Sequence, residues 1–355
     1  MTPELYMSRC LELAQKAKGM TAPNPMVGAV LVCEGRIIGE GWHRQYGGNH
    51  AEVNCLDNVN DSDRHLVPQS TMYVSLEPCA HFGKTPPCAI RLVQEGIKKV
   101  VIANTDPYKL VSGRGISILK EAGIEVETGI GSLEGAWVNR RFFCVHQHSR
   151  PYIILKWAQT QDGYFAPADR SRFQITNGHS GRLLHRWRTE EGAILVGTTT
   201  AINDNPRLTA RKWQGPQPLR LFIDRNLAVP TSHHLSDDTV PTWVLNEKRS
   251  GQAGNNRFIQ INLNDNFLPQ LLLHLNEHKI LSMIVEGGAA LLHSFITAGL
   301  WDEARVFTGA VTLGQGISAP VLVNGQHAFA TMLGADRLDV FTNRVSGAYV
   351  AGCEL

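Results

Sequence analysis

The chain has 355 residues, more than a single hydrophobic core normally organises, so two domains are expected. Its 34 basic and 32 acidic residues leave a formal charge of +2, without the positive excess typical of proteins that bind nucleic acid or anionic membranes. No apolar run approaches the roughly 20 residues that cross a bilayer, the N-terminus lacks the pattern of a secretory signal, and seven thinly spread cysteines favour a reducing cytoplasm.

The first half of the chain alternates short apolar strands with helices. Residues 29–42 predict a hairpin that turns at Glu34-Gly35, and Gly47-Gly48-Asn49 favours a helix start near His50. This rhythm predicts a mixed or mainly parallel sheet covered by helices. The other predicted elements are an opening helix, strands over residues 70–78, 98–104 and 124–130, and helices after Pro86-Pro87 and over residues 112–123.

A second α/β domain is predicted after a closing helix and a connector. Pro151 restarts the chain as a strand, so we place the boundary near Arg150 and expect domains over residues 1–148 and 149–355. The predicted elements of the second half are strands over residues 151–159, 192–197, 219–224 and 242–247, a helix over 182–190, a strand-turn-helix over 281–299, and antiparallel strands over 302–314 and 336–355.

One histidine and two cysteines in the first half have the pattern of zinc ligands. His50 lies two residues before Glu52, Cys79 ends a predicted strand, and Cys88 opens the next helix. One imidazole and two thiolates leave the fourth position of a tetrahedral Zn²⁺ open for water. Glu52 can carry protons from that water to a ring nitrogen and to the departing ammonia, provided that the helix begins at His50. The pattern predicts hydrolytic deamination of a base.

The spacing of the two cysteines bears on the substrate. Eight residues, Ala80 to Pro87, separate them, whereas nucleic-acid and nucleoside deaminases generally have two, so we expect neither a nucleic acid nor an ordinary nucleoside. A structural zinc is the alternative, but such sites normally have four protein ligands. His81 is the nearby candidate for a fourth ligand, and we interpret it instead as lining the enlarged loop.

In the second half, a glycine pair follows an apolar strand. Gly287 and Gly288 come directly after Glu286 and before a predicted helix, where backbone N–H groups and the positive helix end can approach a pyrophosphate. There is no Gly-x-Gly-x-x-Gly after the first strand, so a Rossmann-type dinucleotide site is not supported.

Further motifs surround these residues. They are Asn24-Pro25-Met26-Val27-Gly28, the run from Leu76 to Cys88 that ends in Thr85-Pro86-Pro87-Cys88, and, in the second half, Leu155-Lys156, Asp162-Gly163 and Asp204-Asn205-Pro206. In these motifs the chain resembles the bifunctional deaminase/reductase family of riboflavin biosynthesis over nearly its whole length. The resemblance implies an α/β protein with an N-terminal cytidine-deaminase-like three-layer domain and a C-terminal dihydrofolate-reductase-like domain.

The resemblance also implies two consecutive reactions. The first domain would use Zn²⁺ to deaminate 2,5-diamino-6-ribosylamino-4(3H)-pyrimidinone 5′-phosphate, and the second would use NADPH to reduce the ribosyl side chain to ribityl. By position, the deaminase pocket would be lined by Asn24, His43 and Lys84, with Lys84 meeting the phosphate. In the reductase, the substrate would contact Lys156, Arg188, Leu208, Arg211 and Glu286, and the cofactor would contact Gln159, Gln174, Thr200, Asp204, Arg225, Gly287 and Gly288.

Gln174 stands where members of the family commonly have tryptophan, so a chain with only the deaminase active is one alternative. A nucleic-acid base deaminase with a C-terminal binding domain is another, and near-neutral charge argues against it. We expect a small phosphorylated ribosylaminopyrimidine as the partner, no nucleic acid and no membrane, a cytoplasmic location, and a homo-oligomer of the kind seen in this family.

Overall fold

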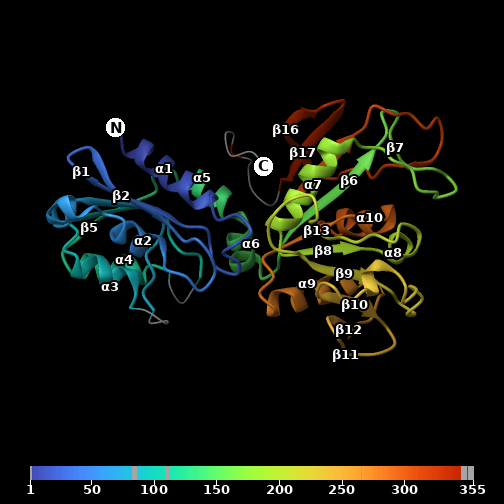
Figure 1. Cartoon of the computed structure of the whole chain (residues 1–355), viewed down its shortest axis with the longest axis horizontal. Helices are drawn as coiled ribbons and strands as arrows, with labels where there is room; N and C mark the ends of the chain where they lie inside the picture. The colour runs from blue at the N-terminus through green and yellow to red at the C-terminus, as the bar shows by residue number, and fades with distance from the viewer. Residues whose placement is uncertain (1, 82–85, 109–111, 265, 345–349, 351–355) are drawn as a thin grey trace. The chain divides into compact units, whose positions relative to one another are not determined.

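A computed structural model describes residues 2–81, 86–108, 112–264, 266–344 and 350 of the chain. The described residues of Met1–His148, together with Val350, form one compact unit, and those of Ser149–Tyr349 form a second, as the colours of Figure 1 help to distinguish. Each unit has its own sheet and its own hydrophobic core. Among the helices that the structure describes, none combines the length and the apolar character that crossing a membrane requires.

The first unit is built on a five-stranded sheet in the order β2-β1-β3-β4-β5. Strand β1 is antiparallel to β2 and β3, whereas β3, β4 and β5 run parallel, so the sheet is mixed. The predicted hairpin turn is confirmed, because Glu34 (φ 49°) and Gly35 (φ 78°) both adopt left-handed backbone. The strands are β1 (Gly28–Cys33), β2 (Arg36–Trp42), β3 (Thr71–Leu76), β4 (Lys99–Asn104) and β5 (Glu125–Thr128).

Helices cover both faces of this sheet and complete the expected three layers. On one face Met7 and Leu13 of α1 pack against β1 and β3, and on the other face lie α2, α3 and α4 with Leu56, Leu92 and Leu119, as Figure 1 shows. The helical segments are α1 (Pro3–Gln15), α2 (Ala51–Asp57), η1 (Asp61–Gln69), α3 (Cys88–Gln94), α4 (Arg114–Glu121), α5 (Ser132–Val138) and α6 (Arg140–His148).

Two glycines set the distance between these helices and the sheet. A Cβ atom at Gly28 would lie 2.0 Å from the carbonyl oxygen of Cys10 in α1, and one at Gly41 would lie 2.2 Å from the backbone nitrogen of Cys55 in α2. Both positions therefore require glycine. The close packing of α2 on β2 fixes the position of that helix, which begins directly after His50.

The second unit contains a ten-stranded sheet in the order β11-β12-β10-β9-β8-β13-β6-β14-β17-β16. The strands from β12 to β14 in this order are parallel, and antiparallel strands complete both edges. The strands of this sheet are β6 (Tyr152–Gln159), β8 (Ala193–Val196), β9 (Leu219–Ile223), β10 (Thr242–Asn246), β11 (Gly251–Ala253), β12 (Asn256–Gln260), β13 (Ser282–Val285), β14 (Glu303–Thr308), β16 (Gly325–Leu333) and β17 (Asp336–Asn343). The strands β7 (Tyr164–Ala166) and β15 (Ile317–Ser318) form a separate two-stranded antiparallel sheet.

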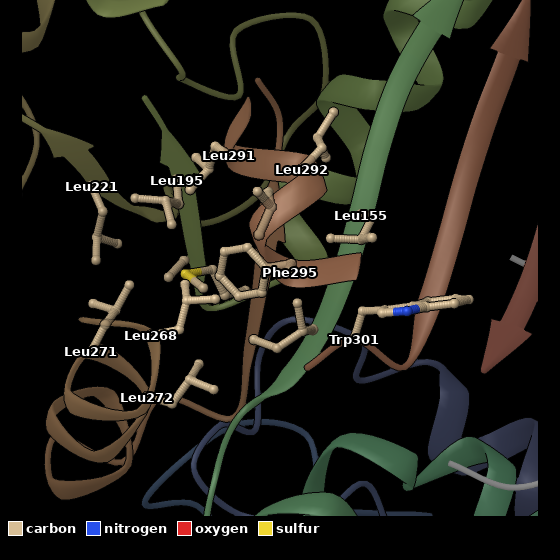
Figure 2. Close-up of a cluster of buried hydrophobic side chains, with 14 of the residues drawn as sticks. Leu155, Leu195, Leu221, Leu268, Leu271, Leu272, Leu291, Leu292, Phe295 and Trp301 are labelled. Atoms are coloured by element: carbon tan, nitrogen blue, oxygen red, sulfur yellow. The ribbon is translucent and has the colours of Figure 1, made fainter. Parts of the chain in front are cut away.

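A leucine-rich core covers one face of this sheet. Figure 2 shows the side chains of α9 and α10 meeting Leu155, Leu195 and Leu221 of three parallel strands. On the opposite face α7 packs its Trp187 against Phe307, with ring centroids 5.4 Å apart. The helical segments are α7 (Gly178–Glu190), α8 (Thr198–Asn203), η2 (His234–Ser236), α9 (Phe267–Glu277) and α10 (Ala289–Thr297).

Candidate active sites

The three predicted zinc ligands lie together in the first unit. His50 is the N-cap residue of α2, Cys79 follows β3, and Cys88 is the first residue of α3. Their ligand atoms all lie within 4.8 Å of one another, and Nδ1 of His50 is 3.5 Å from Sγ of Cys79 and 3.3 Å from Sγ of Cys88. A tetrahedral zinc with bonds of about 2.0 Å to nitrogen and about 2.3 Å to sulfur would separate these atoms by roughly 3.5 Å, so the residues present fit the ion.

The charge state of Cys79 also suits a metal, whereas the hydrogen bond to Cys79 raises the pKa of the Cys88 thiol, which must lose its proton when a metal binds. Hydrogen bonds from Cys88 and His50 lower the pKa of the Cys79 thiol to about 4, and the thiolate is the form that binds metals. The backbone N–H of Cys88 donates to the same sulfur over 3.3 Å. Among the described residues no fourth histidine, cysteine or carboxylate joins the group, and His81 is exposed, which leaves a coordination position for water.

Glu52 lies in the first turn of α2, two residues after the ligand His50. The predicted helix start is confirmed, because His50 has extended backbone and the helix begins at Ala51. His50 therefore lies outside the helix, where the splay of roughly 200° between residues two apart in a helix does not apply. The carboxyl group is buried, with a side chain only 3% exposed, and burial raises the pKa of Glu52 to about 7. A carboxyl with this pKa can both accept and donate a proton near neutral pH.

Asn24 and His43 form a polar pair beside the metal ligands. Nδ1 of His43 lies 3.0 Å from the carbonyl oxygen of Asn49, so this nitrogen carries the proton, and Nε2 can accept the amide N–H of Asn24 over 3.2 Å. Burial lowers the pKa of His43, which keeps the ring neutral. Its ring meets that of His50 edge-on, with centroids 5.4 Å apart. Lys84 lies outside the described residues.

Glu77 supports the zinc site in a way that sequence reasoning missed. Its buried carboxylate accepts backbone N–H groups of Asp106 (3.2 Å), Gly113 (3.0 Å), Gly115 (2.9 Å) and Ile116 (3.3 Å). A Cβ at Gly115 would lie 2.0 Å from the carbonyl oxygen of Pro78, so the start of α4 backs directly onto the residue before Cys79. An acidic residue directly before Pro78-Cys79 is the only sequence signal for this role.

The second candidate site is a cavity of about 620 Å³ in the second unit. It lies where parallel strands end, because its lining includes Ala158 near the end of β6, Val196 at the end of β8 and Glu286 directly after β13. The carboxyl edge of a parallel sheet is the usual place for a ligand in α/β proteins. Of the predicted reductase residues, the lining contains Lys156, Gln174, Arg188, Thr200, Asp204, Leu208, Arg211, Glu286 and Gly288.

A buried ion pair forms the floor of this cavity. Arg188 donates Nε to Glu286 over 3.2 Å and Nη2 to the second carboxylate oxygen over 2.8 Å, and its Nη1 donates to the carbonyl of Thr209 over 3.1 Å. Both side chains of the pair are 8% exposed. Burial lowers the pKa of the neighbouring Lys156, and Glu286 opposes that shift. Arg188 thus has most of its donors engaged within the protein.

The cavity is strongly positive. Beside Lys156 and Arg188 it is lined by Arg170, Arg172, Arg207 and Arg211, against the acidic Asp204 and Glu286. Burial and the charges of Arg188 and Arg207 lower the pKa of Arg211, which indicates that cations crowd one another here. Such a site suits ligands with phosphate groups.

Gly287 and Gly288 bring the start of α10 close to α8. A Cβ at Gly287 would lie 3.1 Å from Cγ2 and from Oγ1 of Thr200, and Gly288 has a φ of 72°. The backbone at this turn and the N-terminus of α10 therefore lie beside Thr200. This arrangement agrees with the predicted phosphate-binding turn.

Three predicted cofactor residues, Gln159, Arg225 and Gly287, are absent from the cavity lining, although Gly287 adjoins Thr200, which lines it. Gln159 accepts the indole N–H of Trp157 over 3.0 Å and donates to Thr308 over 3.5 Å. Arg225 donates Nη2 to the carbonyl of Leu263, and its Nε lies 3.7 Å from Glu247. Both side chains have partners within the protein, and their cofactor contacts remain predictions.

Models of protein families match both units. The cytidine and deoxycytidylate deaminase zinc-binding region matches residues 1–104, and the RibD C-terminal domain matches residues 151–345. Fold, sites and matches together define a two-domain enzyme, a zinc-dependent deaminase joined to a reductase. The chain belongs to the RibD family, whose members are bifunctional deaminase/reductases of riboflavin biosynthesis.

The similarity to individual members extends over both units. The chain is 42% identical over 318 residues to the riboflavin biosynthesis protein RibD of Aquifex aeolicus (88% of each chain). It is 38% identical over 332 residues to that of Bacillus amyloliquefaciens (91% of this chain and 88% of the relative). A crystal structure of a diaminohydroxyphosphoribosylaminopyrimidine deaminase/5-amino-6-(5-phosphoribosylamino)uracil reductase from Thermotoga maritima superposes with a TM-score of 0.87 at 31% identity, covering 96% of this chain and 98% of the other.

Proposed function

We propose that this chain converts 2,5-diamino-6-ribosylamino-4(3H)-pyrimidinone 5′-phosphate to the aminouracil with release of ammonia, and then reduces the ribosyl side chain to ribityl with NADPH. We assign the deaminase to residues 1–148 and the reductase to residues 149–355. The observation that carries the proposal is the convergence of His50, Cys79 and Cys88 beside the buried Glu52, in a chain of the RibD family.

In the deaminase, His50, Cys79 and Cys88 would hold Zn²⁺. A bound zinc lowers the pKa of its water to about 7 and so supplies hydroxide at neutral pH. Glu52 would take one proton from that water and deliver it to the ring nitrogen, and would then move the proton of the newly attached hydroxyl group to the amino group, which leaves as ammonia. Asn24 and His43, fixed to each other over 3.2 Å, orient the pyrimidine, and we assign the substrate phosphate to Lys84.

In the reductase, bound NADPH would supply a hydride to the ribose carbon that bears the amine, while the C–O bond of the sugar ring opens and its oxygen gains a proton. We assign the binding of the cofactor to the backbone of Gly287 and Gly288 and to Thr200, Asp204 and Gln174, all of which except Gly287 line the cavity. Arg211 and Leu208 contact the phosphorylated substrate. Glu286 holds Arg188 over 2.8 Å and lies near Lys156, so the pair and the lysine together fix the polar end of the sugar.

The decisive measurement is a coupled assay on the whole protein. With the diaminopyrimidine substrate and NADPH, the protein should release ammonia and the absorbance of NADPH should fall. When NADH replaces NADPH, the cofactor should be oxidised more slowly. Ammonia release without NADPH oxidation would mean that only the deaminase is active, which is the alternative suggested by Gln174 in place of tryptophan. No ammonia from zinc-loaded protein would refute the deaminase assignment.

The variant Glu52→Gln separates the two activities. Without its proton carrier the deaminase should lose a factor of about 10²–10⁴ in kcat, while the reductase should still turn over when aminouracil substrate is supplied directly. The protein-bound zinc, measured by mass spectrometry of the metal, should be unchanged. Full ammonia release by this variant would contradict the role of Glu52.

We further propose a cytoplasmic homo-oligomer. Cys79 and Cys88 can act as ligands only as reduced thiols, which a reducing compartment maintains. Light scattering of the purified protein measures the oligomer directly.

A further inference from the structure

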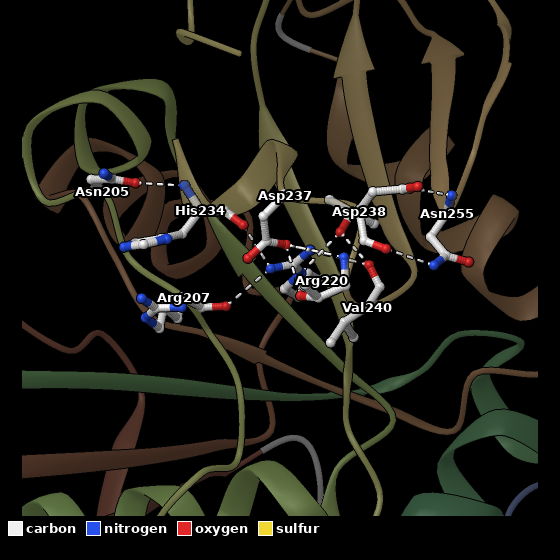
Figure 3. A network of polar contacts seen from close by, with 10 residues as sticks. Asn205, Arg207, Arg220, His234, Asp237, Asp238, Val240 and Asn255 are labelled. Carbon is white, nitrogen blue, oxygen red and sulfur yellow. Dashed lines mark hydrogen bonds and ion pairs between the residues drawn. The ribbon is translucent and has the colours of Figure 1, made fainter. Parts of the chain in front are cut away.

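A fully buried arginine connects the loops around the reductase cavity. Arg220 lies in β9, and its side chain is fully buried. All of its guanidinium N–H groups face an acceptor, which offsets the cost of burying the charge. The bonds, shown in Figure 3, run from Nε to Oγ1 of Thr242 (2.9 Å), from Nη1 to the carbonyls of Arg207 (3.3 Å) and His234 (2.9 Å), and from Nη2 to the carboxylate of Asp237 (3.0 Å) and the carbonyl of Val240 (3.1 Å).

Two of these acceptors belong to the cavity wall. Arg207 and His234 both line the cavity, although they lie in loops on either side of Arg220 in the sequence. The loops are also tied to each other, because the backbone N–H of His234 donates to the side-chain oxygen of Asn205 over 2.8 Å. Arg220 and Asn205 thus bind the two loops into one wall.

The backbone of this wall is in an unfavourable conformation. Asn205 and Leu208 have φ angles of 40° and 53°, in the left-handed region that residues with a Cβ rarely adopt. Such a conformation persists only where surrounding contacts impose it. The bond from Arg220 to the carbonyl of Arg207 acts on the residue directly before Leu208.

We propose that Arg220 is a positioning residue of the reductase: it holds residues 205–208 and 233–240 so that Leu208 and Arg211 face the phosphorylated substrate. The proposal rests on the reductase function proposed above. Arg220 itself is fully buried and is absent from the cavity lining, so it acts through the backbone of its neighbours. Three of its five acceptors are backbone carbonyls. These contacts depend on the side chain of Arg220 and not on the side chain of any one partner.

Lysine is the informative replacement, because an ammonium keeps the charge but cannot reach acceptors on several segments at once. In Arg220→Lys, KM for the aminouracil substrate should rise about tenfold, with kcat within about twofold of wild type, because the loop supplies binding rather than hydride transfer. Hydrogen exchange of the protein without ligands should accelerate in residues 205–211. Slow hydrogen exchange in the central strands β6 and β13 of the same sample serves as the measure that the second unit is folded.

Thr242→Val is the matched control, since it removes the acceptor of Nε and leaves the bonds to both loops. It should lower stability without changing KM or exchange in residues 205–211. If Arg220→Lys folds too poorly to assay, Asn205→Gly cuts the link between the loops while keeping left-handed backbone favourable, and it should raise KM in the same direction.

The outcomes separate the two proposals. If wild type oxidises no NADPH, the reductase function fails, while exchange in residues 205–211 still decides whether Arg220 holds this wall. If wild type is active and Arg220→Lys is merely less stable, with KM and exchange unchanged, Arg220 is a structural residue and the positioning role is refuted.

Discussion

Cys88 serves the deaminase site twice, through its thiol and through its backbone N–H, which donates to Sγ of Cys79 over 3.3 Å. Serine at this position keeps the N–H but replaces the soft sulfur ligand that zinc prefers. In Cys88→Ser, zinc content should fall well below one per chain and ammonia release should drop by at least about 10²-fold.

The control for this variant is Cys33→Ser. Cys33 is a buried cysteine of β1 outside the ligand group, so the protein with this substitution should keep its zinc. Metal analysis after dialysis against a chelator gives the comparison. Retained zinc in Cys88→Ser would remove this cysteine from the ligand set.

The ligand residues could be predicted from sequence because their chemistry and spacing are local signals. Glu77 and Arg220 could not, because their partners are mainly backbone groups of distant segments, from residues 106–116 and 207–240. An arginine inside the apolar run of residues 219–223 was a faint sign of a buried network. Arg225 was predicted from its place after the same strand, but its side chain meets Leu263 and Glu247.

At the scale of elements, the end of β3, the loop after β4 and the start of α4 meet at the carboxylate of Glu77. Glutamine keeps the shape but points an amide N–H₂ at backbone donors, so at least one buried donor loses its acceptor. Glu77→Gln should therefore lower the free energy of unfolding by about 2–3 kcal/mol, as urea titration would measure, and should speed the loss of zinc to a chelator.

Glu125→Gln tests whether any lost carboxylate has the same effect. Glu125 is an exposed partner of Lys99, 2.9 Å away, and such surface pairs contribute roughly 0–1 kcal/mol. Equal destabilisation in both variants would show that the hydrogen bonds of Glu77 have no special weight.

Elements with a clear periodicity were predicted, and elements set by tertiary contacts were not. The β1–β2 hairpin and the strand-turn-helix from β13 to α10 follow local signals. Helix α8 contains three consecutive threonines, which favour strands, yet it forms with Oγ1 of Thr198 bound to the carbonyl of Ile223 over 2.7 Å. No element was predicted between residues 248 and 280, where β11, β12 and α9 lie.

At the scale of the whole molecule, His185 links the folding of the second unit to pH. Burial and the charges of Arg188, Arg211 and Lys212 lower its pKa to about 4, against about 6.5 when unfolded. The unfolded chain therefore binds more protons below pH 6.5, so stability is lost as pH falls from about 6.5 toward 4. In His185→Asn the decrease in the free energy of unfolding that His185 causes over this pH range, on the order of 1 kcal/mol, should disappear.

Asparagine keeps an acceptor for the backbone N–H of Arg211, which His185 Nδ1 now accepts over 3.1 Å. Urea titrations at a series of pH values, with exposed His65→Asn as the control, measure the effect. An identical pH profile in His185→Asn and wild type would exclude this histidine as the source.

The cation-rich cavity of the second unit shows that the small net charge of the chain does not describe the charge at its binding site. A sum of +2 conceals a local excess of positive charge: Arg188 and Glu286 pair with each other, which leaves Lys156 and four further arginines of the lining against Asp204. Field lines from such a hollow extend into solvent over about a Debye length, roughly 8 Å at physiological salt. A nearly neutral protein can thus capture small polyanions by electrostatic steering, at a rate that ionic strength controls.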